Sequence, residues 1–412
     1  MPGRSIVDEL PVHVERDPAE PGIAFLFTQQ TVGLGGRKTS MVFLAEALAR
    51  RGYQVHVVTT QLSWLTKLRG AGKLAEAAAA GAPRNRWYPA DGMRGFLWVP
   101  PVHPVSVRGW LAERLTAPLI SFYGALLPRA VVRPLRQARL VVIESCAAVA
   151  LFRRIRGIAP DARILYSMSD RLTVVGMHPG LDRRLRADAP RYDLVRVPAA
   201  ALLDDLPGAR AALVRHGIDR RAFDRASVSP YVAGPNAVLI GDMMLDQPLL
   251  ERLARAFPSV QFHYFGRTAL DFVAPANLTA WGEQPFERLV PFVQHADVGL
   301  ALYRGASGLA YLAESSLKNL QYRYCGLPVV GPGFAVGMIP GAFPYDLQRP
   351  ESAVEALRAA LSQGRGSPGD IADWDEVASE LLRLTGVENP PEWSETSERS
   401  LSDYSRLQMT SK

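Results

Sequence analysis

Cysteine is rare in this chain of 412 residues, and long apolar runs are missing from it. The two cysteines, Cys146 and Cys325, stand far apart and match no metal-binding or redox spacing, so a reducing cytoplasm is the simplest location. No apolar run reaches the ~18 residues that a membrane span requires. The opening MPGRSIVDELPVHVERDP lacks the apolar core of a signal peptide, so we expect neither export nor integral insertion into a membrane.

Lysine is also scarce, although the chain is basic. Its 47 lysines and arginines exceed its 40 acidic residues, which gives a formal charge of +7 and a pI of about 9.5. Only five of these cations are lysine, and the arginine excess reflects genome bias, so basicity alone is weak evidence for nucleic-acid binding. The composition, 48% hydrophobic and 21% charged, is typical of a soluble globular protein, and the length predicts two domains.

Short β-rich runs alternate with helical patterns along the chain, in two series separated by the Ser-, Pro- and Gly-containing stretch 224–236. The expected strands are 23–27, 55–60, 95–100, 139–144, 163–168 and 193–197, then 237–241, 260–266, 278–282, 298–303 and 327–331. The expected helices include 41–51, 146–156, 246–256, 285–294 and 312–324. Two such series predict an α/β fold of two doubly wound, Rossmann-like domains, with ligands bound in a shared cleft outside the carboxyl ends of the strands.

These patterns predict that the chain has four parts. We expect an N-terminal domain over 18–223, a C-terminal domain over 224–370, a helix over 371–386 that packs back towards the N-terminal domain, and a tail over 387–412. The tail is polar, so we expect it to be disordered.

A glycine-rich loop, TVGLGGRKTS at 31–40, follows the first expected strand. Arg37 stands where a nucleotide-triphosphatase phosphate loop needs glycine before its lysine. Lys38 stands where a dinucleotide-binding G-x-G-x-x-G pattern needs its third glycine. The loop is therefore neither motif as written.

The stretch 303–332 contains the start of an expected helix, and this start has features of a phosphate-binding site. Ser315 or Ser316 as N-cap would leave backbone N–H groups facing the cleft with Lys318 in the first turn, which favours a diphosphate site. The alternative is an ordinary helix with a solvated lysine. The following GLPVV is similar to the nucleotide-sugar half of GT-B glycosyltransferases, but Ala313 and Gln321 replace the paired glutamates of the large retaining families.

Six segments in order resemble the membrane-associated, inverting GT-B β-glucuronosyltransferases of xanthan-type exopolysaccharide biosynthesis. These segments are IESCAAVALF (143–152), SDRLTVV (169–175), RHGID (215–219), GDMMLD (241–246), WGEQ (281–284) and SSLKNLQYRYCGLP (315–328). The resemblance covers about residues 23 to 385. It implies transfer of glucuronate from UDP-glucuronate to a polyprenyl-diphosphate-linked oligosaccharide, with the acceptor held by the N-terminal domain and the nucleotide sugar by the C-terminal domain.

The resemblance also implies site residues. It makes Asp170 the catalytic base, which agrees with its place after an expected strand, because an inverting transfer needs a carboxylate to deprotonate the acceptor. Asp219 matches an acidic position of the family, and a structural role for it is equally open. The donor positions are Met243, Glu283, Tyr303, Leu317, Lys318 and Gln321. Plain core packing remains the alternative for Met243 and Leu317. With lysine and a helix N-terminus neutralising phosphate, we expect no metal and no cofactor.

The acceptor side is expected to meet an anionic membrane surface. Residues 101–140 carry six arginines and one acidic residue, interleaved with aromatic and aliphatic side chains, and 62–73 is a second candidate segment. We assign Arg37, Lys38, Arg108 and Trp110 to this acceptor or membrane side, and a peripheral location on the cytoplasmic face of the inner membrane. The alternatives are a solvated glycine-rich loop and an ordinary amphipathic helix on the N-terminal sheet. Prolines 104, 118 and 128 predict that the region is broken into short pieces.

Three other functions compete with this hypothesis. A UDP-sugar epimerase of GT-B-like fold would share the architecture but has no use for a membrane face. A GT-B transferase could use another UDP-sugar, since no residue proves a carboxylate on the donor. A nucleic-acid-binding protein predicts stacking aromatics along a basic groove, whereas the strongest cluster here is apolar with an arginine rim, so we expect no nucleic-acid partner.

Overall fold

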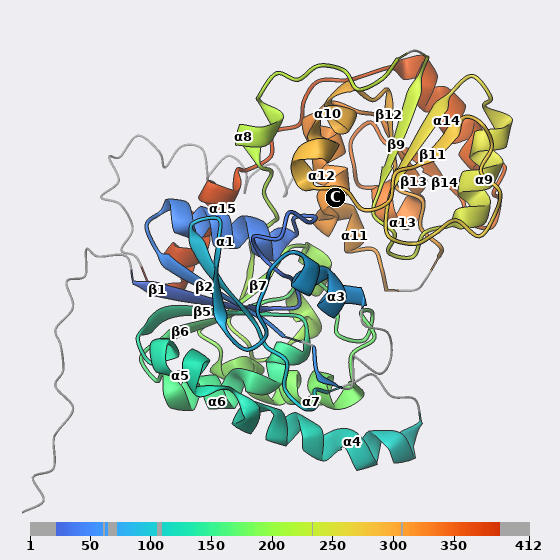
Figure 1. Ribbon diagram of the computed structural model, residues 1–412. Coiled ribbons are helices and arrows are strands. Elements are labelled where there is room, and N and C mark those ends of the chain that lie inside the picture. Colours follow the sequence, from blue (N-terminus) through green and yellow to red (C-terminus); the bar gives the residue numbers. More distant parts are fainter. Residues whose placement is uncertain are drawn as a thin grey trace, which may run out of the picture.

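The computed structural model describes residues 22–387 except 61, 65–71, 105–108, 233, 306 and 307, and the side chains of Lys73 and Glu76. The expected disordered tail, Arg108 and most of the segment 62–73 therefore lie outside the described residues. In the described part, the chain forms two β-sheets with helices on both faces of each, and one sheet lies above the other in Figure 1.

The N-terminal sheet has the order β3-β4-β2-β1-β5-β6-β7-β8. Its strands are β1 (Ile23–Thr28), β2 (Gln54–Thr59), β3 (Trp87–Ala90), β4 (Met93–Leu97), β5 (Ala138–Glu144), β6 (Arg163–Ser167), β7 (Leu194–Val197) and β8 (Ala211–Leu213). All neighbours are parallel except β3 and β4, which pair antiparallel. The central strands are apolar on both faces because helices cover both, so they read as continuous hydrophobic runs in the sequence.

Helices and 3-10 turns connect these strands. The α-helices are α1 (Ser40–Arg50), α3 (Gly72–Ala79), α4 (Trp110–Tyr123), α5 (Arg129–Leu135), α6 (Phe152–Ile158) and α7 (Pro179–Asp188). The 3-10 helices are η1 (Gly124–Leu126), η2 (Ala147–Leu151), η3 (Ala189–Arg191) and η4 (Ala200–Asp205).

The C-terminal sheet is parallel throughout its described strands, in the order β11-β10-β9-β12-β13-β14. Its strands are β9 (Asn236–Ile240), β10 (Gln261–Phe265), β11 (Leu278–Ala280), β12 (Val298–Leu300), β13 (Val329–Pro332) and β14 (Phe343–Tyr345). The helices after the first sheet are α8 (Arg220–Phe223), α9 (Gln247–Ala256), α10 (Phe286–His295), α11 (Leu312–Ser315), α12 (Leu317–Tyr324), α13 (Gly333–Val336), α14 (Ser352–Gln363) and α15 (Trp374–Thr385).

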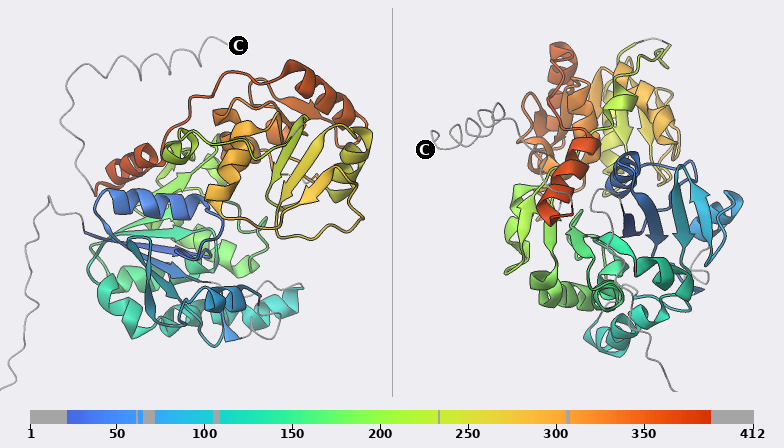
Figure 2. Two further views of the ribbon diagram at one scale, coloured as in Figure 1. Left: turned by 45° about the horizontal axis from the view of Figure 1, so that its top comes forward. Right: turned by 90° about the vertical axis from the view of Figure 1, so that its left-hand side faces the viewer.

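The last helix, α15, returns to the N-terminal domain and lies beside α1 in both views of Figure 2. Its start is well defined, since Asp373 and Glu376 form a reciprocal capping box, and Gly386 ends it in the left-handed conformation. Trp374 stacks on Phe43 of α1 with ring centres 5.6 Å apart. This packing ties the end of the described chain to the N-terminal domain.

Two helix predictions are corrected by the structure. The expected helix 312–324 is two helices, because Ser316 adopts an extended backbone (φ −70°, ψ 113°) between α11 and α12. The expected helix 146–156 begins as the 3-10 turn η2 and becomes α-helical only at Phe152.

The region 101–140 differs from the sequence prediction at one proline. Pro118 lies inside the 14-residue helix α4 without ending it, so the helix is longer than the prolines indicated. Figure 1 shows α4 along the outer side of the N-terminal domain, on the side away from the C-terminal domain. Within the described residues, no single helix is long and apolar enough to cross a membrane. By length and composition alone, the pair Trp110–Leu126 and Arg129–Leu135 passes this test together, with a 65° bend between its members.

Candidate active site

A cavity of about 420 Å³ lies between the two sheets, where the carboxyl ends of strands from both domains meet. The N-terminal domain contributes the ends of β1, β5 and β6, and the C-terminal domain contributes the ends of β9 and β10 together with α11 and α12. This cavity brings together nine of the residues that the sequence predicted. They are Arg37, Lys38, Asp170, Met243, Glu283, Tyr303, Leu317, Lys318 and Gln321.

Asp170 stands just beyond the end of β6, as its place after an apolar strand predicted. Its Oδ1 accepts a hydrogen bond of 2.9 Å from the hydroxyl of Tyr311, a residue of the C-terminal domain. Burial raises the pKa of Asp170 to about 6, while the hydrogen bond from Tyr311 acts in the opposite direction. A carboxylate with a pKa near the working pH is suited to general-base chemistry.

A second buried carboxylate, Glu144, lines the same cavity at the end of β5. Its Oε2 accepts hydrogen bonds from the Thr28 hydroxyl at 2.5 Å and from the Gln29 backbone N–H at 3.1 Å. These bonds fix the carboxylate at the floor of the N-terminal side. Sequence reasoning missed Glu144, although its position at the end of an apolar strand gives the same signal as that of Asp170.

On the opposite wall, the start of α12 presents a cation. Lys318 Nζ lies 4.2 Å from the centre of the Tyr303 ring, and the Tyr303 hydroxyl is 3.2 Å from Ser316 Oγ. Ser316 occupies the N-cap position, but its side chain makes no capping bond. The first N–H groups of α12 and the ammonium of Lys318 together form a positive end that favours a phosphate group.

Met243 and Leu317 also line the cavity, and Met243 is 42% exposed. An exposed apolar side chain in a cavity is suited to pack against the flat ring of a nucleobase. The nearby Glu283 forms an ion pair of 3.2 Å with Arg267, a second cation on this wall that the sequence analysis did not identify.

Asp242 shares this wall as well. Burial opposes its ionised form, but the backbone N–H groups of Arg267 and Thr268 donate to it and hold its pKa below the usual value. The positive charge of Arg37, in the glycine-rich loop, lowers the pKa of Asp242 further. This loop of the N-terminal domain therefore lies close enough to the C-terminal domain to interact with its charges.

Lys38 connects the two domains. Its ammonium pairs with Glu46 of α1 at 3.0 Å and with Glu287 of α10 at 3.1 Å. Burial alone would lower its pKa, but these two carboxylates raise it. Lys38 is thus already neutralised by protein groups, whereas Arg37 is exposed at the mouth of the cavity.

His216 contributes a fixed hydrogen-bond donor to the cavity wall. The buried Arg196 guanidinium donates to His216 Nδ1 at 3.0 Å, and a guanidinium cannot accept. Burial, and then the charge of Arg196, lowers the pKa of His216 far below its usual value, so the ring is neutral and carries its proton on Nε2.

The structure does not bring every predicted residue to the cavity. Asp219 is the N-cap of α8, where its carboxylate accepts from the Ala222 N–H at 3.2 Å. Trp110 begins α4 on the outer surface and is 73% exposed. Arg108 lies outside the described residues. Among the described residues, no group of three or more His, Cys, Asp and Glu side chains is arranged to hold a metal ion.

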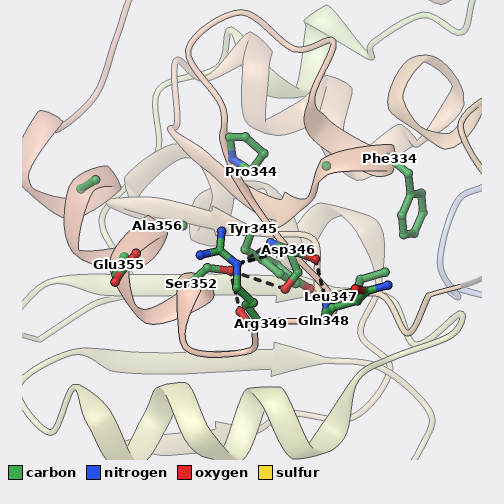
Figure 3. A pocket seen from close by; sticks show the side chains of 12 residues that line it. Phe334, Pro344, Tyr345, Asp346, Leu347, Gln348, Arg349, Ser352, Glu355 and Ala356 are labelled. Carbon is green, nitrogen blue, oxygen red and sulfur yellow. Dashed lines mark hydrogen bonds and ion pairs between the residues drawn. The ribbon is translucent and has the colours of Figure 1, made fainter.

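A second, more open hollow of about 800 Å³ lies on the C-terminal domain between β14 and α14. Figure 3 shows Asp346, Arg349 and Ser352 joined there by hydrogen bonds and an ion pair, which stabilise the turn into α14. The residues that line this hollow include none of those predicted for the site. We therefore place the chemistry in the cavity between the domains.

Comparison with known proteins indicates what the chain is similar to. Residues 26–198 match the family model described as the N-terminal domain of the glucuronosyltransferase GumK. Over 349 residues the chain is 28% identical to a UDP-glucuronate:glycolipid 2-beta-glucuronosyltransferase of Xanthomonas campestris pv. campestris, covering 84% of this chain and 86% of the relative.

Solved structures share the two-domain architecture. A trehalose-6-phosphate structure from E. coli bound with UDP-2-fluoro glucose matches with a TM-score of 0.54 at 11% identity, covering 94% of this chain and 99% of that one. An alpha,alpha-trehalose-phosphate synthase (UDP-forming) from Burkholderia xenovorans in complex with glucose-6-phosphate matches with a TM-score of 0.53 at 12% identity, covering 89% and 97%. At such identity the likeness shows the fold alone. The chain therefore has the GT-B architecture, and its sequence is similar to the glucuronosyltransferases named above.

Proposed function

We propose that this enzyme is an inverting glucuronosyltransferase that moves glucuronate from UDP-glucuronate to a lipid-linked oligosaccharide, with Asp170 as general base. The observation that carries the proposal is that Asp170 and Lys318 line one cavity from opposite domains. The base is thus on the acceptor side, and the positive end of α12 is on the donor side. The activity of the Xanthomonas relative on UDP-glucuronate and a glycolipid supports the choice of substrates.

The reaction that suits this arrangement is a single displacement. Asp170 takes the proton of the acceptor hydroxyl, whose oxygen forms a bond to the anomeric carbon from one face of the sugar. The bond from that carbon to the phosphate oxygen breaks on the opposite face, and its electron pair leaves with UDP. Lys318 and the N-terminus of α12 stabilise the charge that develops on the diphosphate. Because these groups supply the positive charge, the proposal includes no metal ion or other cofactor.

The donor side is proposed to hold UDP through the residues on the C-terminal wall of the cavity. Met243 and Leu317 would pack on the two faces of the uracil ring, and Glu283 and Gln321 would bond to hydroxyl or amide groups. Within the described part of the chain, Arg37 makes no ion pair of the kind that neutralises Lys38, so it is the better placed of the two to meet an acceptor phosphate.

A lipid-linked acceptor requires contact with a membrane, and α4 offers a surface for it. Trp110, Leu111, Leu115 and Phe122 are exposed on this helix, and Arg114 is exposed among them. An apolar face with aromatic residues and a basic rim favours binding to anionic lipid headgroups. We propose a peripheral position on the cytoplasmic face of the inner membrane.

The test is transfer of labelled sugar from a panel of UDP-sugars into the lipid extract of polysaccharide-producing membranes, by wild type and Asp170→Asn. Label from UDP-glucuronate in the lipid fraction, lost in the variant, is the expected result. Transfer from another UDP-sugar would keep the mechanism and replace the donor. Tight UDP binding without any lipid product would contradict the proposal and favour a UDP-sugar epimerase or a soluble acceptor.

A further inference from the structure

Among the described residues, a single side-chain hydrogen bond joins the proposed base to the donor domain, and it runs from Tyr311 to Asp170. The Tyr311 hydroxyl donates to Asp170 Oδ1 at 2.9 Å, across 141 residues of sequence. Tyr311 is 1% exposed, so packing fixes its ring and leaves its hydroxyl little freedom to move. Within the described part of the chain, Asp170 Oδ2 makes no hydrogen bond or ion pair, and Asp170 lines the open cavity.

The segment that carries Tyr311 is attached to the N-terminal domain on both sides of this residue. On one side, Arg171 Nη1 donates to the Gly308 carbonyl at 2.6 Å, and the guanidinium lies 5.5 Å from the centre of the Tyr311 ring. Arg171 is itself held by an ion pair of 2.6 Å to Asp205. These contacts hold the start of the segment against the residue next to the base.

On the other side, Glu314 pairs with Arg215 at 2.9 Å and accepts from the Ala200 N–H at 3.2 Å. Both partners belong to the N-terminal domain. The segment then continues through Ser316 into α12, whose first turn carries Lys318. One short stretch of chain therefore links the base on the acceptor side to the cation on the donor side.

Given the function proposed above, on which this inference rests, we infer that Tyr311 is a positioning residue for Asp170. Its hydroxyl holds Oδ1 and leaves Oδ2 turned to the cavity as the atom that receives the acceptor proton. Because the bond crosses between the domains, the base is in position only while the donor domain is apposed as in this structure.

The protonation states of the two groups agree with this role. Burial, and then the negative charge of Asp170, raises the pKa of Tyr311, so the phenol keeps its proton and remains a donor at neutral pH. Burial raises the pKa of Asp170, and the bond from Tyr311 limits that rise. Without the phenol, Asp170 would be protonated at a higher pH and would be a base over a narrower range.

The test is the pH dependence of sugar transfer by Tyr311→Phe, with the donor identified by the UDP-sugar panel. The acidic limb of kcat is expected to move up by about half to one pH unit, because one hydrogen bond to the ionised carboxylate is lost. The KM for the donor and the affinity for UDP should remain those of the wild type. Tyr324→Phe is the matched control, since Tyr324 also donates to an aspartate, Asp224 at 2.5 Å, and does not line the cavity.

A second variant reverses the sign of the effect and keeps the ring and hydroxyl in place. With 3-fluorotyrosine at position 311, the more acidic phenol is a stronger donor, so the acidic limb should move to lower pH. If the acidic limb of the pH profile of kcat lies at the wild-type pH in both variants, Tyr311 does not position Asp170. That result would leave the proposed function intact. A wild type that transfers no sugar would instead overturn the proposed function, and this inference with it.

Discussion

The ammonium of Lys318 lies 4.2 Å above the centre of the Tyr303 ring, in the first turn of α12. A lysine in the first turn of a helix is unfavourable towards the helix dipole, and the aromatic face offsets part of that cost. The arrangement holds a cation beside free backbone N–H groups at the cavity wall. This arrangement suits an anion, as proposed above for the diphosphate of the donor.

Replacement of Lys318 by alanine should weaken the binding of UDP by roughly 10- to 100-fold, because a charge-assisted contact to diphosphate is lost. Binding of uridine, which lacks the diphosphate, should change little. Isothermal titration with both ligands measures the difference. Arg358→Ala is a matched control, since Arg358 also lies over an aromatic ring, that of Phe257 at 5.8 Å, away from the cavity. An equal loss of affinity for uridine and UDP would contradict a phosphate-binding role.

Asp170→Asn should abolish most transfer and also stabilise the protein at alkaline pH. The loss of a general base predicts a decrease in kcat of about 10²- to 10⁴-fold. Burial raises the pKa of Asp170 in the folded state to about 6, above the usual 3.8 of an aspartate, so the folded state binds the proton more tightly than the unfolded state. The contribution of Asp170 to the free energy of unfolding is therefore fully present below about pH 4, and it is lost as the pH rises through 6.

The stability part of this prediction is measured by thermal unfolding at two pH values. Asparagine carries no charge, so the variant should exceed the wild type by about 1–2 kcal/mol at pH 8 and equal it at pH 4. Water in the open cavity screens the Asp170 carboxylate, so the gain is smaller than the full pKa shift would give. A variant that is less stable than the wild type at pH 8 would show that Asp170 has a structural role.

Replacement of the Asp219 carboxylate should have little effect on transfer, unlike that of Asp170. The structure places Asp219 at the N-cap of α8 and outside the cavity lining. Asparagine caps helices as well as aspartate does, so Asp219→Asn should retain both stability and most transfer activity. Asp219→Ala should lose about 1 kcal/mol of stability, since the Ala222 N–H loses its acceptor. Chemical denaturation and the transfer assay, run on both variants, measure this. Loss of transfer in Asp219→Asn at unchanged stability would restore the catalytic role that the sequence left open.

The fold and the cavity were predictable because their signals are local. Each parallel strand is a short apolar run bounded by turn residues, and Asp170 and the start of α12 follow from positions at the ends of such elements. The contact between Tyr311 and Asp170 has no such signal, because 141 residues separate them and only the apposition of two domains creates it. Ser316 was named with Ser315 as a candidate N-cap, and it is the N-cap of α12, whereas the separate short helix α11 before it was not distinguished from α12. Pro118 was misjudged because a proline inside a helix can be tolerated on an exposed face.

The outer face of α4 supports a prediction about membrane binding. Trp110 and Leu115 are 73% and 71% exposed on this helix, with arginines nearby, so their side chains are free to enter a lipid interface. The double variant Trp110→Glu, Leu115→Glu should reduce binding to vesicles containing anionic lipid by at least tenfold, through lost apolar burial and added repulsion. Affinity for UDP should not change, because neither residue lines the cavity.

Vesicle co-sedimentation at low and high salt measures this effect. The double variant Val232→Glu, Val273→Glu is the matched control, since these valines are 102% and 86% exposed away from α4 and their replacement adds the same two charges elsewhere. If both variants bind vesicles as the wild type does, the α4 face is not the lipid contact. If both lose binding equally, the added negative charge alone would explain the result. Selective loss in the α4 variant, together with weaker binding of the wild type at high salt, would support the orientation in which the acceptor domain faces the membrane.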